Sequence, residues 1–221
     1  MARPRTFDAD DALARARAAL WAGGIHATSV AELSAATGLT VGSLYKAFAD
    51  KPTLVRRALE TYLDAGLAWT ADRLGRATGA EGGTPGDENP GDRAPGDGAR
   101  TATPLAGIET WLRAVAELAA SDAPTRGCFA VQCAAELAER DGRVRERLAA
   151  HDAALRALVA DELRREARAG LWRGDAELHA RVLLTLVNGL QLDARKGLEA
   201  RDAHAVVDAA LAGLRAARPP P

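Results

Sequence analysis

Cysteine, aromatic residues and lysine are scarce in this sequence. Aromatics make up 4% of the 221 residues, and the chain has two cysteines, four histidines and lysine only at positions 46, 51 and 196. Two cysteines are too few for a disulfide framework. No catalytic-triad spacing, Gly-rich phosphate loop or metal-ligand cluster is found. A net charge of −1 excludes a uniformly basic surface, so any contact with nucleic acid has to be local. We expect a binding protein, not an enzyme, with no cofactor and no metal.

Long apolar runs and strand-like patterns are also missing. No run approaches the roughly 18 apolar residues that span a bilayer, and the first residues lack the apolar segment of a secretory signal. We therefore expect a cytoplasmic protein that makes no contact with a membrane. No segment alternates apolar and polar residues with β-branched enrichment, whereas Ala, Leu and Arg recur throughout and favour helix. The predicted fold class is all-α.

The two cysteines, Cys128 and Cys133, fall in a segment with helical periodicity. Five residues at about 100° each place them about 140° apart around the helix axis. They therefore do not share a face, and we interpret them as small buried apolar side chains. A metal-binding or redox pair stays open as the alternative.

One segment divides the chain into two helical units. Residues 77–103 are dense in Gly, Pro and Asp and hold almost nothing apolar larger than Ala. Such a composition cannot bury enough surface to offset the entropy of ordering, which predicts a disordered loop. The expected organisation is an N-terminal helical domain at 1–52, a connecting helix at 53–76, the loop at 77–103, and a C-terminal helical domain at 104–217.

Capping and turn signals set the helix boundaries. Ser29 with Glu32 has the spacing of a capping box, Gly38 marks a tight turn, and Thr40 and Asp50 suit N-caps. In the first unit these signals predict helices that run from a cap at Asp8 or Asp10 to about 22, then over 30–37 and 41–48, and onward from 51. In the second unit they predict helices over about 105–120, 128–139, 142–170, 175–196 and 202–217.

The segment 28–51, TSVAELSAATGLTVGSLYKAFADK, is the most specific feature of the chain. Two short helices joined by a turn with glycine describe a helix-turn-helix. The second helix of such a motif presents its N-terminal turn to a major groove. The residues expected to form the common core of the two helices are Val30, Leu33, Leu39, Leu44 and Phe48.

The run GLTVGSLYKAFADK at 38–51 resembles the signature of the TetR family of transcriptional regulators, and TSVAEL at 28–33 fits the opening of the family's second helix. The resemblance covers about residues 7–65 and is only architectural beyond the loop. It implies a three-helix DNA-binding domain joined by a long helix to a helical ligand-binding and dimerisation domain. It also implies a repressor that a small-molecule effector releases from double-stranded operator DNA. The alternative function is a helical interaction protein with a degenerate helix-turn-helix.

The resemblance also implies which residues touch DNA. Side chains that open the second and third helices would contact phosphates and base edges, Lys51 would contact a phosphate, and two arm arginines would enter the minor groove. The alternatives are that Tyr45 packs inside the protein, that Lys46 is a solvated surface charge, and that the arm arginines make no contact with DNA. The complete set is Arg3, Arg5, Thr28, Ser29, Thr40, Val41, Gly42, Ser43, Tyr45, Lys46 and Lys51.

The predicted helix at 175–196 is apolar around most of its circumference, which requires burial on both sides. We therefore expect a homodimer formed through this helix and the helix at 202–217. The family usually binds its effector within this domain, and large or polar residues on otherwise apolar helices are the candidates, each with a core or capping role as the alternative. They are Trp69, Trp111, Phe129, Gln132, Cys133, His151, His179, Asn188 and Gln191.

Overall fold

The computed structural model describes residues 8–76, 103–121 and 127–217. In these ranges the chain forms nine α-helices and no strand, so the predicted all-α fold class is confirmed. Arg3, Arg5 and the expected loop at 77–103, apart from Thr103, lie outside the described residues.

The N-terminal unit begins with three helices, α1 (Ala9–Gly23), α2 (Val30–Thr37) and α3 (Val41–Phe48), and continues into the long α4 (Lys51–Arg76). Asp8 caps α1 by accepting two N–H groups of its first turn. The observed boundaries follow the predicted caps because each helix start leaves N–H groups that a nearby side-chain oxygen has to satisfy.

The second unit contains α5 (Ala106–Ala119), α6 (Phe129–Leu137), α7 (Gly142–Arg168), α8 (Ala176–Ala194) and α9 (Ala200–Ala216). Aspartates at the N-caps of α7 and α8 accept bonds from the first turns of these helices. Each of the five helices lies within a few residues of its predicted range.

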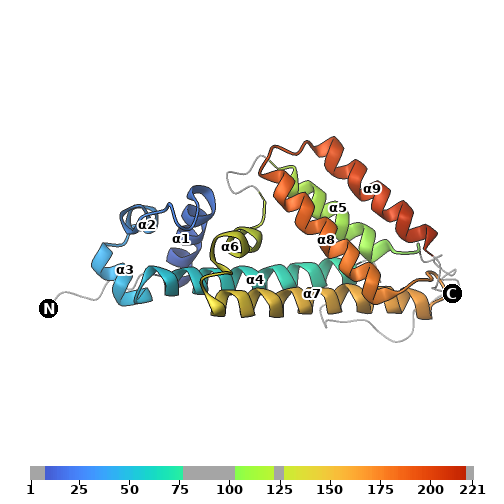
Figure 1. Ribbon diagram of the computed structural model, residues 1–221, viewed down its shortest axis with the longest axis horizontal. Helices are drawn as coiled ribbons and strands as arrows, with labels where there is room; N and C mark the ends of the chain where they lie inside the picture. The colour runs from blue at the N-terminus through green and yellow to red at the C-terminus, as the bar shows by residue number, and fades with distance from the viewer. Residues whose placement is uncertain (1–7, 77–102, 122–126, 218–221) are drawn as a thin grey trace, which may run out of the picture.

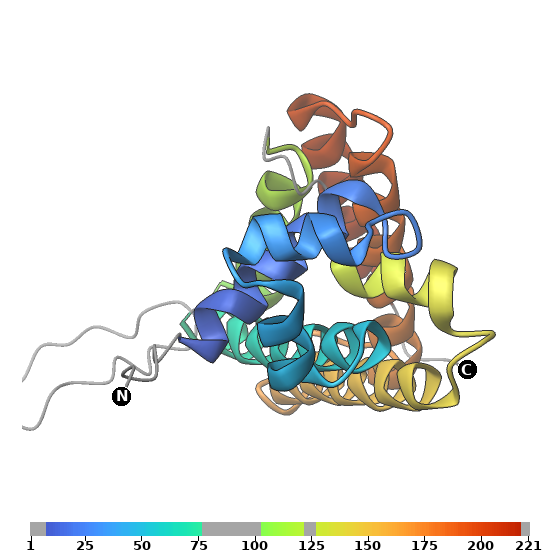
Figure 2. The same cartoon turned by 90° about the vertical axis from the view of Figure 1, so that its left-hand side faces the viewer.

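The helices form an elongated molecule. The long helices α4 and α7 run side by side, with α1–α3 at one end and α5, α8 and α9 at the other, and α6 lies between the two groups (Figure 1). Figure 2 looks at the same arrangement from the α1–α3 end. Among the helices of the described ranges, none has the length and apolar character needed to cross a bilayer.

Two buried cores hold these groups together. The first lies among α1–α4, and α6 inserts Phe129 and Cys133 into it. The second lies among the end of α4 and helices α5, α7, α8 and α9, and it includes Trp111 and Trp172. Each large apolar side chain that is fully buried contributes about 1.5–3 kcal/mol to stability. Helix α6 belongs to the second unit in sequence, yet it packs its apolar face against the N-terminal unit.

Candidate nucleic-acid interface

The geometry of α2 and α3 follows from local capping and from a shared core. The Ser29 hydroxyl accepts from the Glu32 N–H (3.2 Å), and the Glu32 carboxylate accepts from the Ser29 N–H (2.6 Å), so the predicted capping box is confirmed. Gly38 ends α2 with φ 69°, a left-handed conformation that favours glycine. Leu33, Leu44 and Phe48 are buried, which fixes α3 against α2 and α4.

Helix α3 turns one face outward. Val41 and Tyr45 keep 41% and 43% of their surface exposed, and Gly42 and Lys46 beside them are exposed too. The Thr40 hydroxyl caps the helix by accepting from the Ser43 N–H (3.2 Å), and it donates to the Ser43 hydroxyl (3.0 Å). Residues four positions apart are neighbours on a helix surface, so Val41 lies beside Tyr45 and Gly42 beside Lys46, and both pairs are exposed along α3. The structure therefore gathers the α3 residues of the predicted DNA contact set.

Three other predicted contacts flank α3, and their side chains already bond within the protein. Thr28 is buried, and its hydroxyl donates to the Gly24 carbonyl (2.7 Å). Ser29 is exposed, although its hydroxyl is shared with Glu32. Lys51 Nζ donates to the Thr28 carbonyl (2.6 Å) and lies 3.4 Å from a second carbonyl, that of residue 26. Thr28 in this conformation does not offer its hydroxyl outward, whereas Lys51 joins the start of α4 to the turn before α2.

The bonds of Ser29 also hold a negative charge at the start of α2. A backbone hydrogen bond from Ser29, followed by its hydroxyl, lowers the pKa of Glu32, and the more distant charge of Lys51 acts in the same direction. Glu32 is therefore ionised at neutral pH and serves as a cap, as expected.

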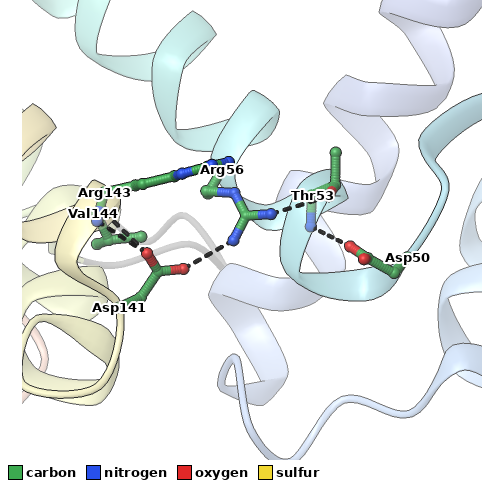
Figure 3. Close-up of polar contacts among 6 residues, drawn as sticks. All are labelled: Asp50, Thr53, Arg56, Asp141, Arg143 and Val144. Atoms are coloured by element: carbon green, nitrogen blue, oxygen red, sulfur yellow. Dashed lines mark hydrogen bonds and ion pairs between the residues drawn. The ribbon is translucent and has the colours of Figure 1, made fainter.

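The first turn of α4 is tied to the start of α7 by a row of polar contacts (Figure 3). Asp50 accepts from the Thr53 N–H (2.6 Å), and Arg56 donates to the Thr53 hydroxyl and to the Asp141 carboxylate, both at 2.9 Å. The other Asp141 oxygen accepts from the N–H groups of Arg143 (3.0 Å) and Val144 (3.2 Å). Only two residues separate the end of α3 from the start of α4, so this row connects α3 to the second unit.

The positive charge of Arg56 stabilises the ionised carboxylate of Asp141. Burial raises the pKa of Asp141, but the hydrogen bond from Arg56 and those from the backbone outweigh it, and the pKa is lowered. The Asp141 carboxylate is therefore ionised when it pairs with Arg56.

The nine residues predicted to bind an effector do not gather at one site. Trp111 is buried in the second core and Phe129 and Cys133 in the first, whereas Asn188 is exposed on α8 and Gln191 is half-buried. The amide group of Gln132 is bonded to Leu20, Glu136 and Arg195. All nine remain predictions for effector binding.

The other three predicted effector residues are half-buried at separate places. The guanidinium of Arg73 lies 3.8 Å from the Trp69 ring centroid. His179 lies edge-on to Trp172 with ring centroids 5.2 Å apart. Burial lowers the pKa of His151, and the charge of Arg147 lowers it further, while Asp152 and Asp64 act in the opposite sense. His151 is therefore neutral at pH 7.

The two cysteines lie in different surroundings. Cys133 is fully buried, and burial raises the pKa of its thiol, so the thiol stays protonated and is a poor metal ligand. Cys128 stands at the N-cap position of α6 without a side-chain capping bond, is half-buried and lies 3.4 Å from the Tyr62 hydroxyl, which donates to its sulfur.

A cavity that the sequence did not indicate opens at the end of the second unit. Its volume is about 670 Å³, and it lies among the start of α5, the turn between α7 and α8, and the end of α9. None of the nine predicted effector residues lines it. Part of the cavity wall is the turn at 171–173, which carries two apolar side chains and one cationic side chain. The two glycines that flank this turn, Gly170 and Gly174, were the only local sign of the cavity in the sequence.

The fold and the surface of α3 define a helix-turn-helix protein with a helical C-terminal domain. The sequence matches the family model for bacterial regulatory proteins of the tetR family over residues 12–58. It also matches the model for a Tetracyclin repressor-like C-terminal domain over residues 104–211. The chain belongs to the TetR family of bacterial transcriptional regulators.

Individual relatives agree with this assignment. The HTH-type transcriptional repressor ComR of Escherichia coli K12 is 44% identical over 62 residues, which is 28% of this chain and 30% of ComR. A cysteine mutant of the TetR family regulator CifR, complexed with 26-bp double-strand operator DNA, is 28% identical with a TM-score of 0.76, and the alignment covers 96% of this chain and all of that one. A TetR family regulator from Agrobacterium tumefaciens, 22% identical over 93% of this chain and 96% of its own, shares the fold with a TM-score of 0.73.

Proposed function

We propose that this protein binds double-stranded operator DNA through α3 and represses transcription, acting by binding and not by catalysis. The observation that carries the proposal is the outward face of α3, where Val41, Gly42, Tyr45 and Lys46 are exposed while Leu44 on the opposite side is buried. A valine methyl can pack on thymine, and a lysine at the same surface can contact a phosphate or guanine. Binding of operator DNA by the related CifR supports this use of the face.

We further propose that the protein acts as a homodimer through α8 and α9. Leu178, Val182 and Leu192 on α8 are 54%, 55% and 51% exposed and follow helical spacing along one face. The outer face of α9 is lined by alanine and glycine together with Val206, which allows helices to approach closely. Two α3 helices on a two-fold dimer would meet a pseudo-palindromic site about one DNA turn apart, or a multiple of it.

Selection of genomic fragments by the purified protein tests DNA binding. The expected result is enrichment of a few fragments whose affinity falls steeply between about 50 and 200 mM salt, because counterions are released from each contacted phosphate. Tyr45→Ala should abolish enrichment. Arg168→Ala, which removes an exposed charge at the end of α7 far from α3, should leave it intact (Figure 1). No enrichment by the wild-type protein would instead favour a helical interaction protein with a degenerate helix-turn-helix.

The effector is proposed to act through α4. This helix carries Lys51 at the DNA-binding end and packs Trp69 against the second core, so a ligand that changes the second unit can shift it. Native mass spectrometry of the purified protein is the first search for a bound small molecule. A compound found this way should lower the affinity for the selected duplex, and an unchanged affinity at saturation would contradict the coupling.

A further inference from the structure

The turn between α1 and α2 is held from α6 by a single carboxylate. Glu136 Oε1 accepts from the N–H of Ile25 (3.1 Å), and Oε2 accepts from the N–H of His26 (2.8 Å). The His26 ring Nε2 lies 3.0 Å from the Glu136 carbonyl oxygen. Burial raises the pKa of Glu136, but hydrogen bonds from His26, Gln132 and Ile25 outweigh it and lower the pKa. An ionised carboxylate that accepts two adjacent backbone N–H groups fixes both the position and the orientation of the turn.

The same carboxylate is connected to the end of α8. Gln132 lies one helical turn before Glu136, and its amide Nε2 donates to Glu136 Oε1 (2.9 Å) and to the Leu20 carbonyl (3.3 Å). Its Oε1 accepts from Arg195 Nη1 (2.7 Å), at the C-cap of α8. Gln132 is buried, so water competes little for these bonds. We call the bonds from Arg195 through Gln132 and Glu136 to the turn the α6 bridge.

A close backbone approach fixes the start of α6 on α8 as well. Gly127 has φ +85°, and a Cβ there would lie 2.6 Å from the Gln191 carbonyl oxygen and 2.8 Å from Arg195 Cγ. Any side chain at this position would collide with backbone, so glycine is required. Helix α6 therefore rests on the end of α8 at two points, and a movement of that end is transmitted to it.

At its other end the α6 bridge reaches residues that border the proposed DNA surface. The carbonyl groups of His26 and Thr28 accept from Lys51 Nζ, and the next residue, Ser29, caps α2. A displaced turn would therefore move the starts of α2 and α4 together.

We propose that Glu136 is a positioning residue for DNA binding, and that the α6 bridge sets the orientation of α1–α3 from the end of α8. The proposal rests on the proposed function, and it adds a route from the proposed dimer helix to DNA that passes through α6 and not along α4. Without the α6 bridge, helices α1–α3 sample more orientations relative to the rest of the protein. The apparent affinity for DNA then falls in proportion to the fraction of molecules whose orientation allows binding.

Two substitutions at the end of α8 give a matched comparison on the selected duplex. Arg195→Met removes one positive charge and the bond to Gln132, whereas Lys196→Met removes one positive charge that, within the described ranges, pairs with Asp193 in its own turn. Loss of one partly buried charge-assisted bond predicts that Arg195→Met weakens binding about 5–20-fold. Lys196→Met should change it less than about twofold, since it removes an exposed pair.

A double substitution separates the bridge from a general loss of stability. Glu136→Gln breaks the bridge at the turn, so adding Arg195→Met should weaken binding by less than about twofold more, whereas independent effects would add. The slope of affinity against salt should stay at the wild-type value in both variants, because neither residue touches a phosphate. Three outcomes would overturn the proposal. The first is that the losses of affinity from Glu136→Gln and Arg195→Met add, and the second is that Arg195→Met and Lys196→Met lose equal affinity. The third is that the loss of affinity matches a lowered folded fraction measured by thermal unfolding.

Hydrogen exchange tests the same bridge without DNA. The amides of Ile25 and His26 should exchange faster in Glu136→Gln and in Arg195→Met, but not in Lys196→Met. If the wild-type protein selects no DNA and these amides still respond, the proposed function fails while the α6 bridge stands as a coupling. Unchanged exchange in Arg195→Met would overturn the bridge itself.

Discussion

Arg56 and Asp141, 85 positions apart in the chain, form an ion pair of 2.9 Å that joins the first turns of α4 and α7 (Figure 3). Both side chains keep less than a quarter of their surface exposed, so the pair is partly shielded from water. Asp141 has a second role, because its other oxygen caps α7. One carboxylate thus stabilises a helix start and connects the two units.

The two roles of Asp141 can be separated by substitution. Asp141→Ala loses both the cap and the pair, whereas Asp141→Ser keeps a capping oxygen and loses the pair. We expect a loss of about 2 kcal/mol in the free energy of unfolding for the alanine variant and about 1 kcal/mol for the serine variant, measured by urea denaturation. Arg56→Met should match the serine variant, and combining the two should cost no more than either alone. Equal losses for alanine and serine would contradict the capping role.

A direct DNA contact by Lys46 would show in the salt dependence of binding. Lys46→Met should weaken binding to the selected duplex and lower the magnitude of the slope of log affinity against log salt by about 1, the effect of one lost phosphate contact. Arg168→Met, at the far end of α7, should leave the slope unchanged. A weaker affinity with the wild-type slope would place Lys46 against a base, and an unchanged affinity would leave it in solvent; both outcomes exclude a phosphate contact.

The outer face of α8 should control the oligomeric state. Val182→Glu places a charge in the middle of the face that also carries Leu178 and Leu192, and burial of an unpaired charge is strongly unfavourable. We expect this variant to be monomeric by analytical ultracentrifugation and to lose DNA affinity. Ala157→Glu, an equal change at an exposed position on α7, should remain a dimer. A dimeric Val182→Glu protein would exclude this face as the interface.

Glu162 should make stability depend on pH. Glu162 is 1% exposed, and one of its carboxylate oxygens has no hydrogen-bond partner among the residues that the structure describes. Burial raises its pKa, although the charge of Arg165 opposes the rise. A carboxyl whose pKa is raised by folding favours the protonated form, so the cost of its charge is absent below its unfolded pKa and grows as the pH increases above it.

Glu162→Gln removes this cost at the same size. At pH 7 to 8 we expect the variant to unfold about 2–4 °C higher than wild type, which corresponds to about 1 kcal/mol. The difference should disappear as the pH falls below the ordinary glutamate pKa of 4.5. Thermal unfolding followed by circular dichroism across this range is the measurement. A difference that grows toward acid pH would show that the charged form is stabilised in the folded protein.

Predictions from sequence were most accurate where the cause is local. The start of α2 follows from Ser29 and Glu32, three positions apart, and its end follows from Gly38, which adopts a left-handed conformation that few other residues tolerate. The buried side of α3 follows from the spacing of Leu44 and Phe48. These features depend on neighbours within one or two helical turns, which the sequence itself specifies.

The predictions for individual contacts depended on partners far away in the chain. Lys51, a predicted phosphate contact, donates to the Thr28 carbonyl, 23 positions away in the chain. Gln132, which remains a predicted effector residue, bonds to Leu20, 112 positions away, and to Arg195. Such contacts are set by which helices pack together, and a polar residue on an apolar face looks the same for any partner.

The sequence by itself determined that the chain is helical, where its helices begin and end, and which short segment forms the helix-turn-helix, because caps, glycines and apolar spacing act over a few residues. Only the tertiary structure decided that α6 buries its apolar face in the N-terminal unit and that its Glu136 holds the turn before α2. The reason is that a buried carboxylate or amide is stable only beside groups that complete its hydrogen bonds, and packing between distant helices brings those groups together.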